Sequence, residues 1–464
     1  MHSSPLSFGI VATLAGTASA FWRMSCPGDV LNERADPIVS PGQVSSHVHR
    51  IAGGNGFNFS MDYEDTQASI CSSCTVKEDL SNYWTPKFYF HAKNGSYIDV
   101  PNAGLFVYYE QRYSAGETTL QAFPEGFRMV AGDPFKRNYT GDLAAQAIQF
   151  ACLDYNDATP QTNNLPNKNC PDGLRAQVYF PSCWDGVNLD SPDHKSHMSY
   201  PINNTFDNGN CPPSHPVRLI SLFYEFLYSV NDFADQWYGD SQPFVFANGD
   251  PTGYGFHGDF INGWNVTVLQ KAIETCTDST GGVIEDTCLV LTQFTADECK
   301  ACQLAPRINE TVTGTLEKLP GCNELTYGPE PATPQSCDDT ATIGSSKKYY
   351  TDVTSDGWAY VGCGSDDYFN RTFAALNTYS ADNMTIAFCV EYCESNGYTW
   401  AGTEYSSQCY CDNNAPPADR APVPGLIGEC DMMCTGDETQ YCGGSNAISI
   451  YQKCGSDSCY NAAE

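Results

Sequence analysis

Basic residues are scarce in this sequence. Its 464 residues include 23 Lys and Arg against 55 Asp and Glu, which gives a formal net charge of −32. A surface of this kind repels polyanions, so we expect no nucleic-acid partner. Neutral glycans or cations suit it better, although an acidic surface also simply keeps a secreted protein soluble.

Long hydrophobic runs are missing after the first twenty residues. No later stretch approaches the roughly 20 apolar residues that cross a bilayer, and the last residues offer no hydrophobic tail, so we expect no membrane anchor. Residues 1–20 have the pattern of a signal peptide, an apolar run followed by an Ala-Ser-Ala cleavage site. We therefore expect a secreted protein, extracellular or associated with the cell wall, whose mature chain begins at Phe21.

Cysteine, in contrast, is abundant. The chain has 23 cysteines, and this number indicates an oxidising compartment. We interpret the C-x-x-C motifs that begin at Cys71 and Cys299 as parts of structural disulfides, since redox and zinc sites are rarer in secreted chains. The odd count leaves at least one cysteine outside an intrachain pair. N-x-Ser/Thr sequons predict glycosylation at exposed positions, namely Asn58, Asn94, Asn138, Asn203, Asn265, Asn309, Asn370 and Asn383.

The sequence from residue 21 to about 265 predicts a mainly β domain, a sandwich with long loops. Its short runs of aromatic and β-branched residues are bounded by Gly, Pro, Asn and Asp, as strands usually are. The clearest of these runs are 84–91, 104–109, 176–180 and 217–224. One short helix is expected in this domain, at 142–152.

The pattern changes after residue 265. Residues 266–326 are interpreted as a helical, cystine-rich appendage, with helices expected at 266–275 and 295–303. A Pro-rich and then Ser/Thr/Asp-rich stretch, 327–356, predicts a linker. A separate module follows at 357–451, and a tail at 452–464 contains Cys454 and Cys459, which we expect to pair with each other.

Eight cysteines in fewer than a hundred residues predict a disulfide framework for the C-terminal module. They are Cys363, Cys389, Cys393, Cys409, Cys411, Cys430, Cys434 and Cys442. The segments that carry them, from 388–393 to 440–445, resemble the WSC domain of fungal cell-wall stress sensors and wall-active enzymes. The resemblance implies a small α+β carbohydrate-binding fold of the PAN-like type that holds fungal wall glucan. Independently, Tyr398, Trp400 and Tyr405 could stack on sugar faces, and each could equally be a core residue.

Histidines gather in four polar motifs of the N-terminal domain. The motifs span 44–54, 180–200, 211–225 and 248–264, and they contain His47, His49, His194, His197, His215 and His257. In this order they resemble a family of secreted fungal proteins known only as domain of unknown function nineteen-ninety-six. The resemblance covers about 21–264 and implies a secreted fungal protein that is often joined to WSC modules. It implies no activity.

We expect the four motifs to meet in one polar cleft, and cleavage of a neutral glucan is the favoured function. A glycoside hydrolase needs two carboxylates about 5 to 9.5 Å apart. The candidate catalytic residues are Asp185, Asp193, His194, Glu225 and Asp259. The candidate substrate contacts are His47, His49, Arg50, Trp184, His197, Tyr254 and His257. A lyase acting on uronates is less favoured, because an acidic protein repels an anionic polymer.

Two other functions stay open. In one, the domain performs no chemistry and the protein is a wall-binding or structural factor. In the other, His47 and His49, which would face the same side of a strand, bind a zinc- or copper-like ion together with His194 and His197. We expect no cofactor apart from the divalent metal of this second alternative.

Overall fold

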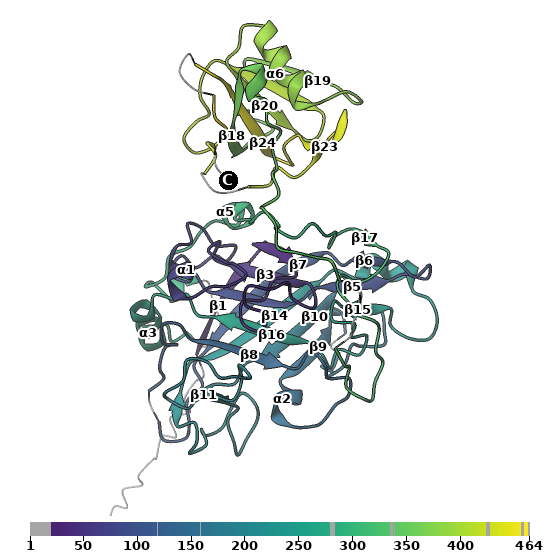
Figure 1. The fold of residues 1–464 in the computed structure, drawn as a ribbon. Coiled ribbons are helices and arrows are strands. Elements are labelled where there is room, and N and C mark those ends of the chain that lie inside the picture. The colour runs from purple at the N-terminus through teal and green to yellow at the C-terminus, as the bar shows by residue number, and fades with distance from the viewer. Residues whose placement is uncertain are drawn as a thin grey trace, which may run out of the picture.

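The protein consists of a large β sandwich and a small α+β module. The computed structural model describes residues 20–117, 119–157, 159–278, 284–334, 337, 339–423, 427–455 and 459–462. The expected signal peptide, apart from its last residue, lies outside these ranges. Figure 1 shows the module standing apart from the sandwich, on the side where α5 (Ala296–Ala301) lies. No helix within the described ranges is long and apolar enough to cross a membrane.

One layer of the sandwich is a five-stranded antiparallel sheet, which we call the first sheet. Leu105, Val107 and Tyr109 are buried in one of its strands while their neighbours Phe106 and Tyr108 are only half-buried, which is the period of two of a sheet with one face in the core. The strand order is β1 (Phe21–Cys26), β7 (Asn102–Glu110), β14 (Ser221–Tyr228), β10 (Leu174–Tyr179) and β9 (Ile148–Cys152).

The other layer consists of two sheets, and the chain passes between them several times. The second sheet has the order β2 (Leu31–Glu33), β3 (His49–Gly53), β4 (Asn82–Pro86), β16 (His257–Ile261) and β8 (Arg128–Gly132). The third sheet has the order β15 (Phe244–Phe246), β5 (Phe88–His91), β6 (Tyr97–Asp99) and β17 (Thr315–Leu316). Only Lys87 separates β4 from β5, so the chain passes directly from one sheet into the other.

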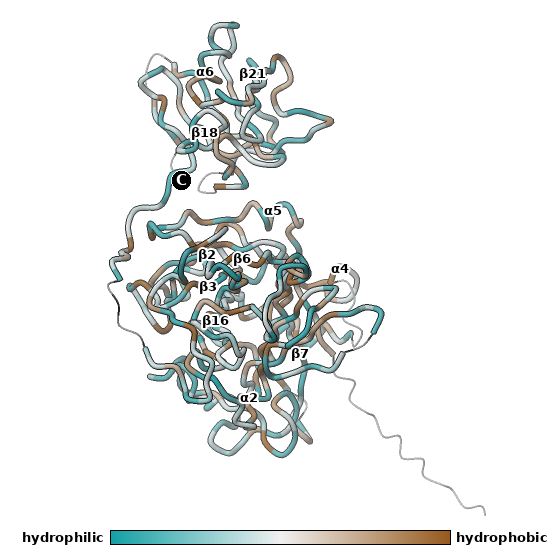
Figure 2. Tube along the Cα trace, turned by 90° about the vertical axis from the view of Figure 1, so that its right-hand side faces the viewer, coloured by the Kyte–Doolittle hydropathy of each residue, from teal (hydrophilic) through white to brown (hydrophobic). Residues whose placement is uncertain are grey.

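The main core lies between the two layers. Tyr224 of the first sheet packs edge-on against Tyr83 of the second, with ring centroids 5.5 Å apart, and its hydroxyl donates to the carbonyl oxygen of Asp259 at 3.0 Å. Figure 2 shows hydrophobic segments concentrated along the strands in the interior. Since Tyr224 points into the sandwich, its neighbours in β14 must point out of the first sheet. The prediction of a mainly β, sandwich-like domain is confirmed.

The outer face of the second sheet is also covered. Ile51, Trp84 and Val130 lie on it and form a second cluster with residues of the surrounding loops. The Cys71–Cys302 disulfide ties the appendage over this face, across 231 residues of sequence. His49 and His257 lie on this covered face, and His47 lies beside them.

Helices are few and peripheral. The prediction at 266–275 is confirmed by α3 (Val266–Thr275), which begins where the Asn265 side chain accepts a hydrogen bond from the Val268 N–H. The prediction at 295–303 is confirmed by α5. The remaining short elements are α1 (Tyr63–Gln67), α4 (Ile284–Thr287), the 3₁₀ helices η1 (Val230–Gln236) and η2 (Thr354–Asp356), and a small sheet of β12 (Met198–Ser199), β11 (Cys183–Trp184) and β13 (Val217–Arg218).

The helix expected at 142–152 is wrong for most of its length. One turn, α2 (Leu143–Gln146), is capped by the Asp142 side chain, and the chain then becomes strand β9. Ile148 and Phe150 alternate inward and pair with β10, so the sheet determines the conformation of a segment whose local propensity favours a helix.

Disulfides account for every described cysteine except one. The C-x-x-C motifs are structural, because Cys71 pairs with Cys302 and Cys74 with Cys26, which leaves Cys299 free and buried. The expected Cys454–Cys459 pair is confirmed. The other N-terminal pairs are Cys152–Cys170, Cys183–Cys211, Cys276–Cys288 and Cys322–Cys337.

The C-terminal module packs one helix against one sheet. Its antiparallel sheet has the order β18 (Trp358–Ser365), β24 (Ala447–Lys453), β20 (Trp400–Glu404), β21 (Gln408–Asp412) and β19 (Leu376–Tyr379). A hairpin of β22 (Met433–Cys434) and β23 (Asp437–Tyr441) lies beside it. Two disulfides, Cys389–Cys409 and Cys393–Cys411, fix helix α6 (Ile386–Ser395) to β21, and Cys363–Cys430 and Cys434–Cys442 complete the framework.

Candidate functional site

The register of the second sheet brings two distant histidines to one place. His49 of β3 is paired with Pro86 of β4, and the β4–β16 register places His257 in the same row, on the far side of Pro86. Both side chains share the covered outer face of the sheet. The compact proline between them leaves room for the two imidazoles to approach each other.

Three imidazoles form the centre of the site. His47 lies two residues before His49 on the same face, as the sequence predicted, and their ring centroids are 4.3 Å apart. His47 Nε2 is 3.1 Å from His257 Nε2. One nitrogen from each of the three rings lies within 4.8 Å of the other two, and all three residues are buried. Burial holds the pKa of His49 down to about 4 and that of His257 down to about 3, so these rings are neutral.

Hydrogen bonds to two backbone carbonyl oxygens and to one serine hydroxyl orient the rings. His49 Nδ1 lies 3.0 Å from the carbonyl oxygen of Ala35, and His257 Nδ1 lies 2.9 Å from that of Gly255. His47 Nδ1 lies 3.0 Å from Ser46 Oγ. The Nε2 atoms of all three rings consequently face the centre of the cluster.

Two buried carboxylates lie next to the imidazoles. Asp259 Oδ2 is 4.0 Å from His257 Nε2, and burial, followed by the nearby charge of Asp36, raises the Asp259 pKa well above its ordinary value. Burial also raises the pKa of Asp36, whose Oδ1 accepts hydrogen bonds from the Ile38 and Val39 N–H groups. Asp36 belongs to none of the predicted motifs, and no sequence signal marked it.

A rigid loop positions Gly255 and therefore His257. Arg137 and Asp250 are both fully buried, 3.6 Å apart, and Asp250 also accepts a hydrogen bond from the Gly255 N–H at 2.7 Å. A Cβ atom on Gly255 would lie 2.6 Å from Arg137 Nη1, so the glycine is needed for this close packing. The glycines of the 248–264 motif thus serve the geometry of this loop.

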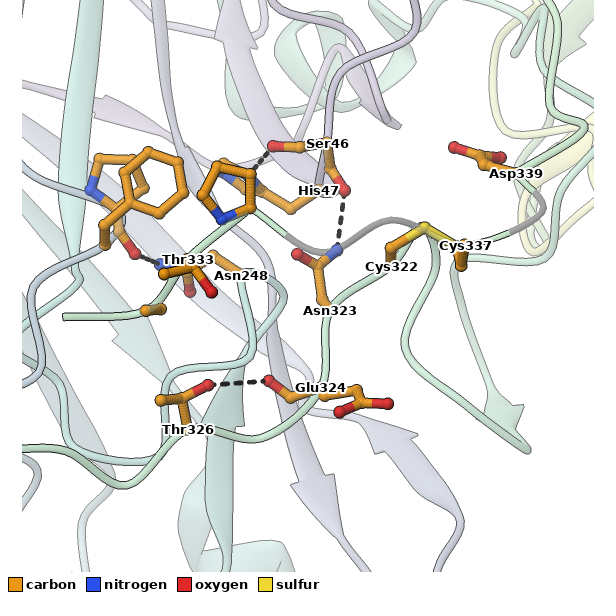
Figure 3. Close-up of a pocket in the computed structure, with 14 residues that line it drawn as sticks. Ser46, His47, Asn248, Cys322, Asn323, Glu324, Thr326, Thr333, Cys337 and Asp339 are labelled. Atoms are coloured by element: carbon orange, nitrogen blue, oxygen red, sulfur yellow. Dashed lines mark hydrogen bonds between the residues drawn. A yellow bond between two sulfur atoms is a disulfide. The ribbon is translucent and has the colours of Figure 1, made fainter. Parts of the chain in front are cut away.

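A pocket of about 400 Å³ opens next to His47 (Figure 3). Ser46, Phe135, Asn248 and Asn323 are among its walls, together with the Cys322–Cys337 disulfide. His49 and His257 do not line it, so they lie behind His47 as seen from the pocket. Solvent therefore reaches the cluster from the His47 side.

The predicted metal set is wrong in its second half. His194 Nδ1 is paired with Asp190 at 2.8 Å, and His197 uses both nitrogens, one toward Ser191 Oγ and one toward the Arg128 carbonyl oxygen. Their loop packs along β8, where the Val130 N–H donates to the His194 carbonyl oxygen at 3.0 Å. His194 adopts a left-handed backbone with φ of 57°, and the two side chains do not reach the cluster.

The carboxylates of Asp185 and Asp193 in the 183–200 loop accept hydrogen bonds from residues of the same loop. Asp193 accepts hydrogen bonds from the Ser196 N–H and hydroxyl and from the Ser191 hydroxyl, which holds its pKa well below the ordinary value. At Asp185 burial raises the pKa, but the hydrogen bonds from the Asn188 and Val187 N–H groups and from the Asn188 side chain together outweigh it and lower the pKa. Both side chains brace the loop.

Other predicted residues lie away from the cluster. Glu225 projects from the outer face of the first sheet, where Tyr108 donates to it at 2.8 Å. Arg50 is buried in an ion pair with Asp29 at 2.8 Å, so the prediction that it contacts substrate is wrong. Trp184 donates to the Asn188 carbonyl oxygen, and Tyr254 lines a separate pocket beside Lys195. The single cleft expected from four motifs is thus not formed: 44–54 and 248–264 meet at the histidine cluster, whereas 180–200 and 211–225 pair with each other through β11, β13 and the Cys183–Cys211 disulfide.

In the C-terminal module the aromatic candidates differ in exposure. Tyr405 is 53% exposed at the turn between β20 and β21, whereas Tyr398 and Trp400 are half-buried and pack on the module's cores. All eight sequon asparagines, from Asn58 to Asn383, are exposed, as glycosylation requires.

Comparisons with known proteins identify both parts of this two-domain architecture. The profile of the domain of unknown function DUF1996 matches residues 36–264, and the profile of the WSC domain matches residues 360–444. The chain therefore joins an N-terminal DUF1996 domain to a C-terminal WSC domain, as the motifs predicted. The WSC domain is generally associated with carbohydrate binding.

The similar curated proteins match parts of the chain. A WSC domain-containing protein of Arthroderma benhamiae is 39% identical over 100 residues, 21% of this chain and 11% of the relative. A Chaetomium globosum protein named as a candidate fungistatic metabolite is 31% identical over 137 residues, 28% of this chain and 54% of the relative. Xylosyltransferase oxt of Drosophila melanogaster is 33% identical over 93 residues, 20% of this chain and 10% of the relative. The chain spans about a tenth to a half of these proteins, and together with the domains they support a fungal protein associated with the cell wall.

Proposed function

We propose that this protein binds neutral glucan of the fungal cell wall through its WSC domain and thereby holds the DUF1996 domain at the wall. The observation that carries this proposal is a group of exposed aromatic side chains on the side of the WSC sheet opposite helix α6, on the loop after β18 and at the end of the edge strand β19. The strong negative charge of the whole chain favours a neutral polymer over an anionic one.

The register of the module's sheet separates its two faces. Ala401, Cys409 and Cys411 face α6 and share a core with it. Glu404, Gln408 and Tyr379 are in one row of paired residues, so their side chains share the opposite face.

The middle of that face is buried, since Tyr410, Ile448 and Ile450 form a cluster with Phe373, and the exposed rings and polar groups lie on the loop after β18 and at the end of β19. Tyr368, Phe369 and Tyr379 are 71%, 94% and 65% exposed. The guanidinium of Arg371 lies over the rings of Tyr368 and Tyr410, at 5.3 and 4.9 Å from their centroids. Flat rings next to hydrogen-bonding groups are what a sugar ring needs, because its faces are apolar and its edges carry hydroxyls. None of the three most exposed rings was among the sequence candidates.

The geometry favours binding over glycan cleavage by the expected carboxylates. A glycosidase needs a carboxyl group with a raised pKa opposite a second carboxylate. Asp185 and Asp193 have lowered pKa values. Glu225 and Asp259 lie on opposite outer faces of the sandwich, so they cannot act on one bond.

Sedimentation with insoluble glycans tests the proposal. Full-length protein should co-sediment with fungal wall β-glucan, and the triple variant Tyr368→Ala/Phe369→Ala/Tyr379→Ala should bind at least about tenfold more weakly, since about 1.4 kcal/mol of lost contact is a factor of ten. Phe388→Ala, which removes a partly exposed ring from α6 on the other face, is the matched control and should bind normally.

Retention of the triple variant at the wild-type level would contradict the proposed binding face. Analysis of the supernatants for soluble sugars addresses the hydrolase hypothesis in the same experiment. Release of oligosaccharides by the wild type would restore that hypothesis, through residues other than Asp185, Asp193, Glu225 and Asp259.

A further inference from the structure

The hydrogen bonds of the histidine cluster determine where its protons are. A carbonyl oxygen only accepts hydrogen bonds, so His49 Nδ1 and His257 Nδ1, which face the carbonyls of Ala35 and Gly255, must carry hydrogen. In a neutral imidazole the other nitrogen then carries no hydrogen and has a free lone pair. Both Nε2 atoms are therefore electron-pair donors within a buried space.

The centre of the cluster contains more acceptors than donors. Within the part of the chain that the structure describes, His49 Nε2 and Asp259 Oδ2 are buried and have no hydrogen-bond partner. His47 Nε2 and His257 Nε2 approach to 3.1 Å. A buried polar group without a partner is unfavourable, so a fold that gathers several of them at one point is stabilised by a positive charge there.

A shared proton does not supply this compensation. If Ser46 donates to His47 Nδ1, then the hydrogen on His47 Nε2 can be donated to His257 Nε2. This arrangement satisfies a single contact and leaves both His49 Nε2 and Asp259 Oδ2 unpartnered. A divalent cation can accept electron pairs from all of these atoms at once, whereas a water molecule can donate hydrogen bonds to only two of them.

We propose that His47, His49 and His257 bind one divalent transition-metal ion through their Nε2 atoms, with Asp259 Oδ2 as the fourth ligand. Tetrahedral coordination with metal–ligand distances near 2.0–2.1 Å separates ligand atoms by roughly 3.3 Å. The corresponding distances in the cluster are 3.1 Å between His47 and His257 and 4.0 Å between His257 and Asp259, and the three nitrogens lie within 4.8 Å of one another. Small side-chain movements bring the three imidazole nitrogens to coordination distance, whereas Asp259, which is outside that group of three, has to move farther.

The surroundings are those of a built site. Proteins orient a metal-binding imidazole by a hydrogen bond from its other nitrogen to a carbonyl, which is the arrangement of His49 and His257. A divalent ion also balances the charge of Asp259 and of the nearby Asp36 when these carboxyl groups are ionised. The two residues are only 1% and 4% exposed. Imidazole ligands select zinc, copper and related ions over magnesium and calcium. The pocket beside His47 gives such an ion a route from solvent.

Metal analysis of the full-length, disulfide-bonded protein tests the proposal. After stripping with a chelator, the protein is titrated with Zn²⁺, Cu²⁺ and Mg²⁺, and retained metal is counted after gel filtration. We expect one Zn²⁺ or Cu²⁺ ion per chain and no retained Mg²⁺. His257→Ala and Asp259→Asn should lower the Zn²⁺ affinity about 100-fold and about tenfold, respectively, and His194→Ala should leave it unchanged because His194 is paired with Asp190.

X-ray absorption on the Zn²⁺-loaded wild type keeps the test independent of variants that fail to fold. The expected spectrum shows nitrogen and oxygen neighbours near 2.0–2.1 Å with the outer-shell pattern of three imidazoles. Sulfur neighbours, fewer imidazoles, absence of bound ion in the wild type, or equal affinity of wild type and His257→Ala would each overturn the site.

Discussion

At the scale of the residue, one arginine of the WSC domain gathers two carboxylates. Arg371 Nη1 is 2.7 Å from both Asp366 Oδ2 and Glu404 Oε2. Burial, followed by the hydrogen bond and charge of Asp366, raises the pKa of Glu404 to about 8. One positive charge therefore faces a carboxyl pair that retains a proton at neutral pH.

The retained proton predicts a pH dependence of stability. Folded Glu404 holds the proton up to about pH 8, whereas the unfolded residue releases it near 4.5. Its contribution to stability is complete below pH 4.5 and is lost as the pH rises to 8, because the folded state binds more protons in this window. We expect denaturant midpoints of the WSC domain to fall across this range, and Glu404→Gln to flatten the curve. Parallel curves for the two proteins would contradict the assignment.

The sequence predicted the site only in part, and particular residues show why. His47 and His49 were correctly placed on one side, because the two-residue period is local, although His47 lies just before strand β3 and not in it. His257 joins them only through the pairing of β3 and β16 with β4, which no short-range signal encodes. His194 and His197 were grouped with them on spacing alone, and each is instead satisfied by neighbours in its own loop.

At the scale of the element, the close contact between β8 and β16 depends on one glycine. Gly132 has a φ of +89°, and a Cβ atom there would lie 2.6 Å from the Phe256 carbonyl oxygen and 2.8 Å from His257 Cα. The end of β8 thus presses directly against the strand that begins with His257.

Gly132→Ala should therefore destabilise the sandwich and disturb the His257 ring. Strain of the left-handed backbone and the displaced strand together should cost about 3 kcal/mol or more. Gly95→Ala is a matched control, since its φ is +90° and nothing lies within 4 Å of its Cβ position, so it should cost only about 1 kcal/mol. Chemical denaturation measures both. Similar losses in the two variants would show that the strand contact contributes nothing.

Local signals identified most elements but not all. Helix α3 was predicted with its correct bounds because Asn265 caps an amphipathic run. Strand β9 was mistaken for helix because Ile148 to Cys152 has mixed propensity, and its pairing with β10, more than twenty residues away, decides its conformation.

At the scale of the whole molecule, the sandwich and the WSC domain have separate cores. The hydrophobic clusters of the two parts share no residue. Two cooperative units joined by a linker are expected to unfold independently.

Calorimetry of the full-length chain should accordingly show two transitions. Cys393→Ala/Cys411→Ala opens a WSC disulfide that spans 18 residues and should destabilise only the smaller transition, by about 3 kcal/mol. Cys152→Ala/Cys170→Ala opens a sandwich disulfide of the same span and should move only the larger one. A single transition that both variants shift equally would mean that the two parts unfold as one unit.

The Cys71–Cys302 bond has a consequence for the way the protein responds to proteolysis. It closes a covalent ring that contains the strands from β4 to β16 and the loops between them. A protease that cuts one of those loops opens the ring but releases no fragment, because both new ends stay attached through the sulfur bridge. A nicked molecule therefore keeps its histidine cluster and its WSC domain in one piece until it meets a reducing agent.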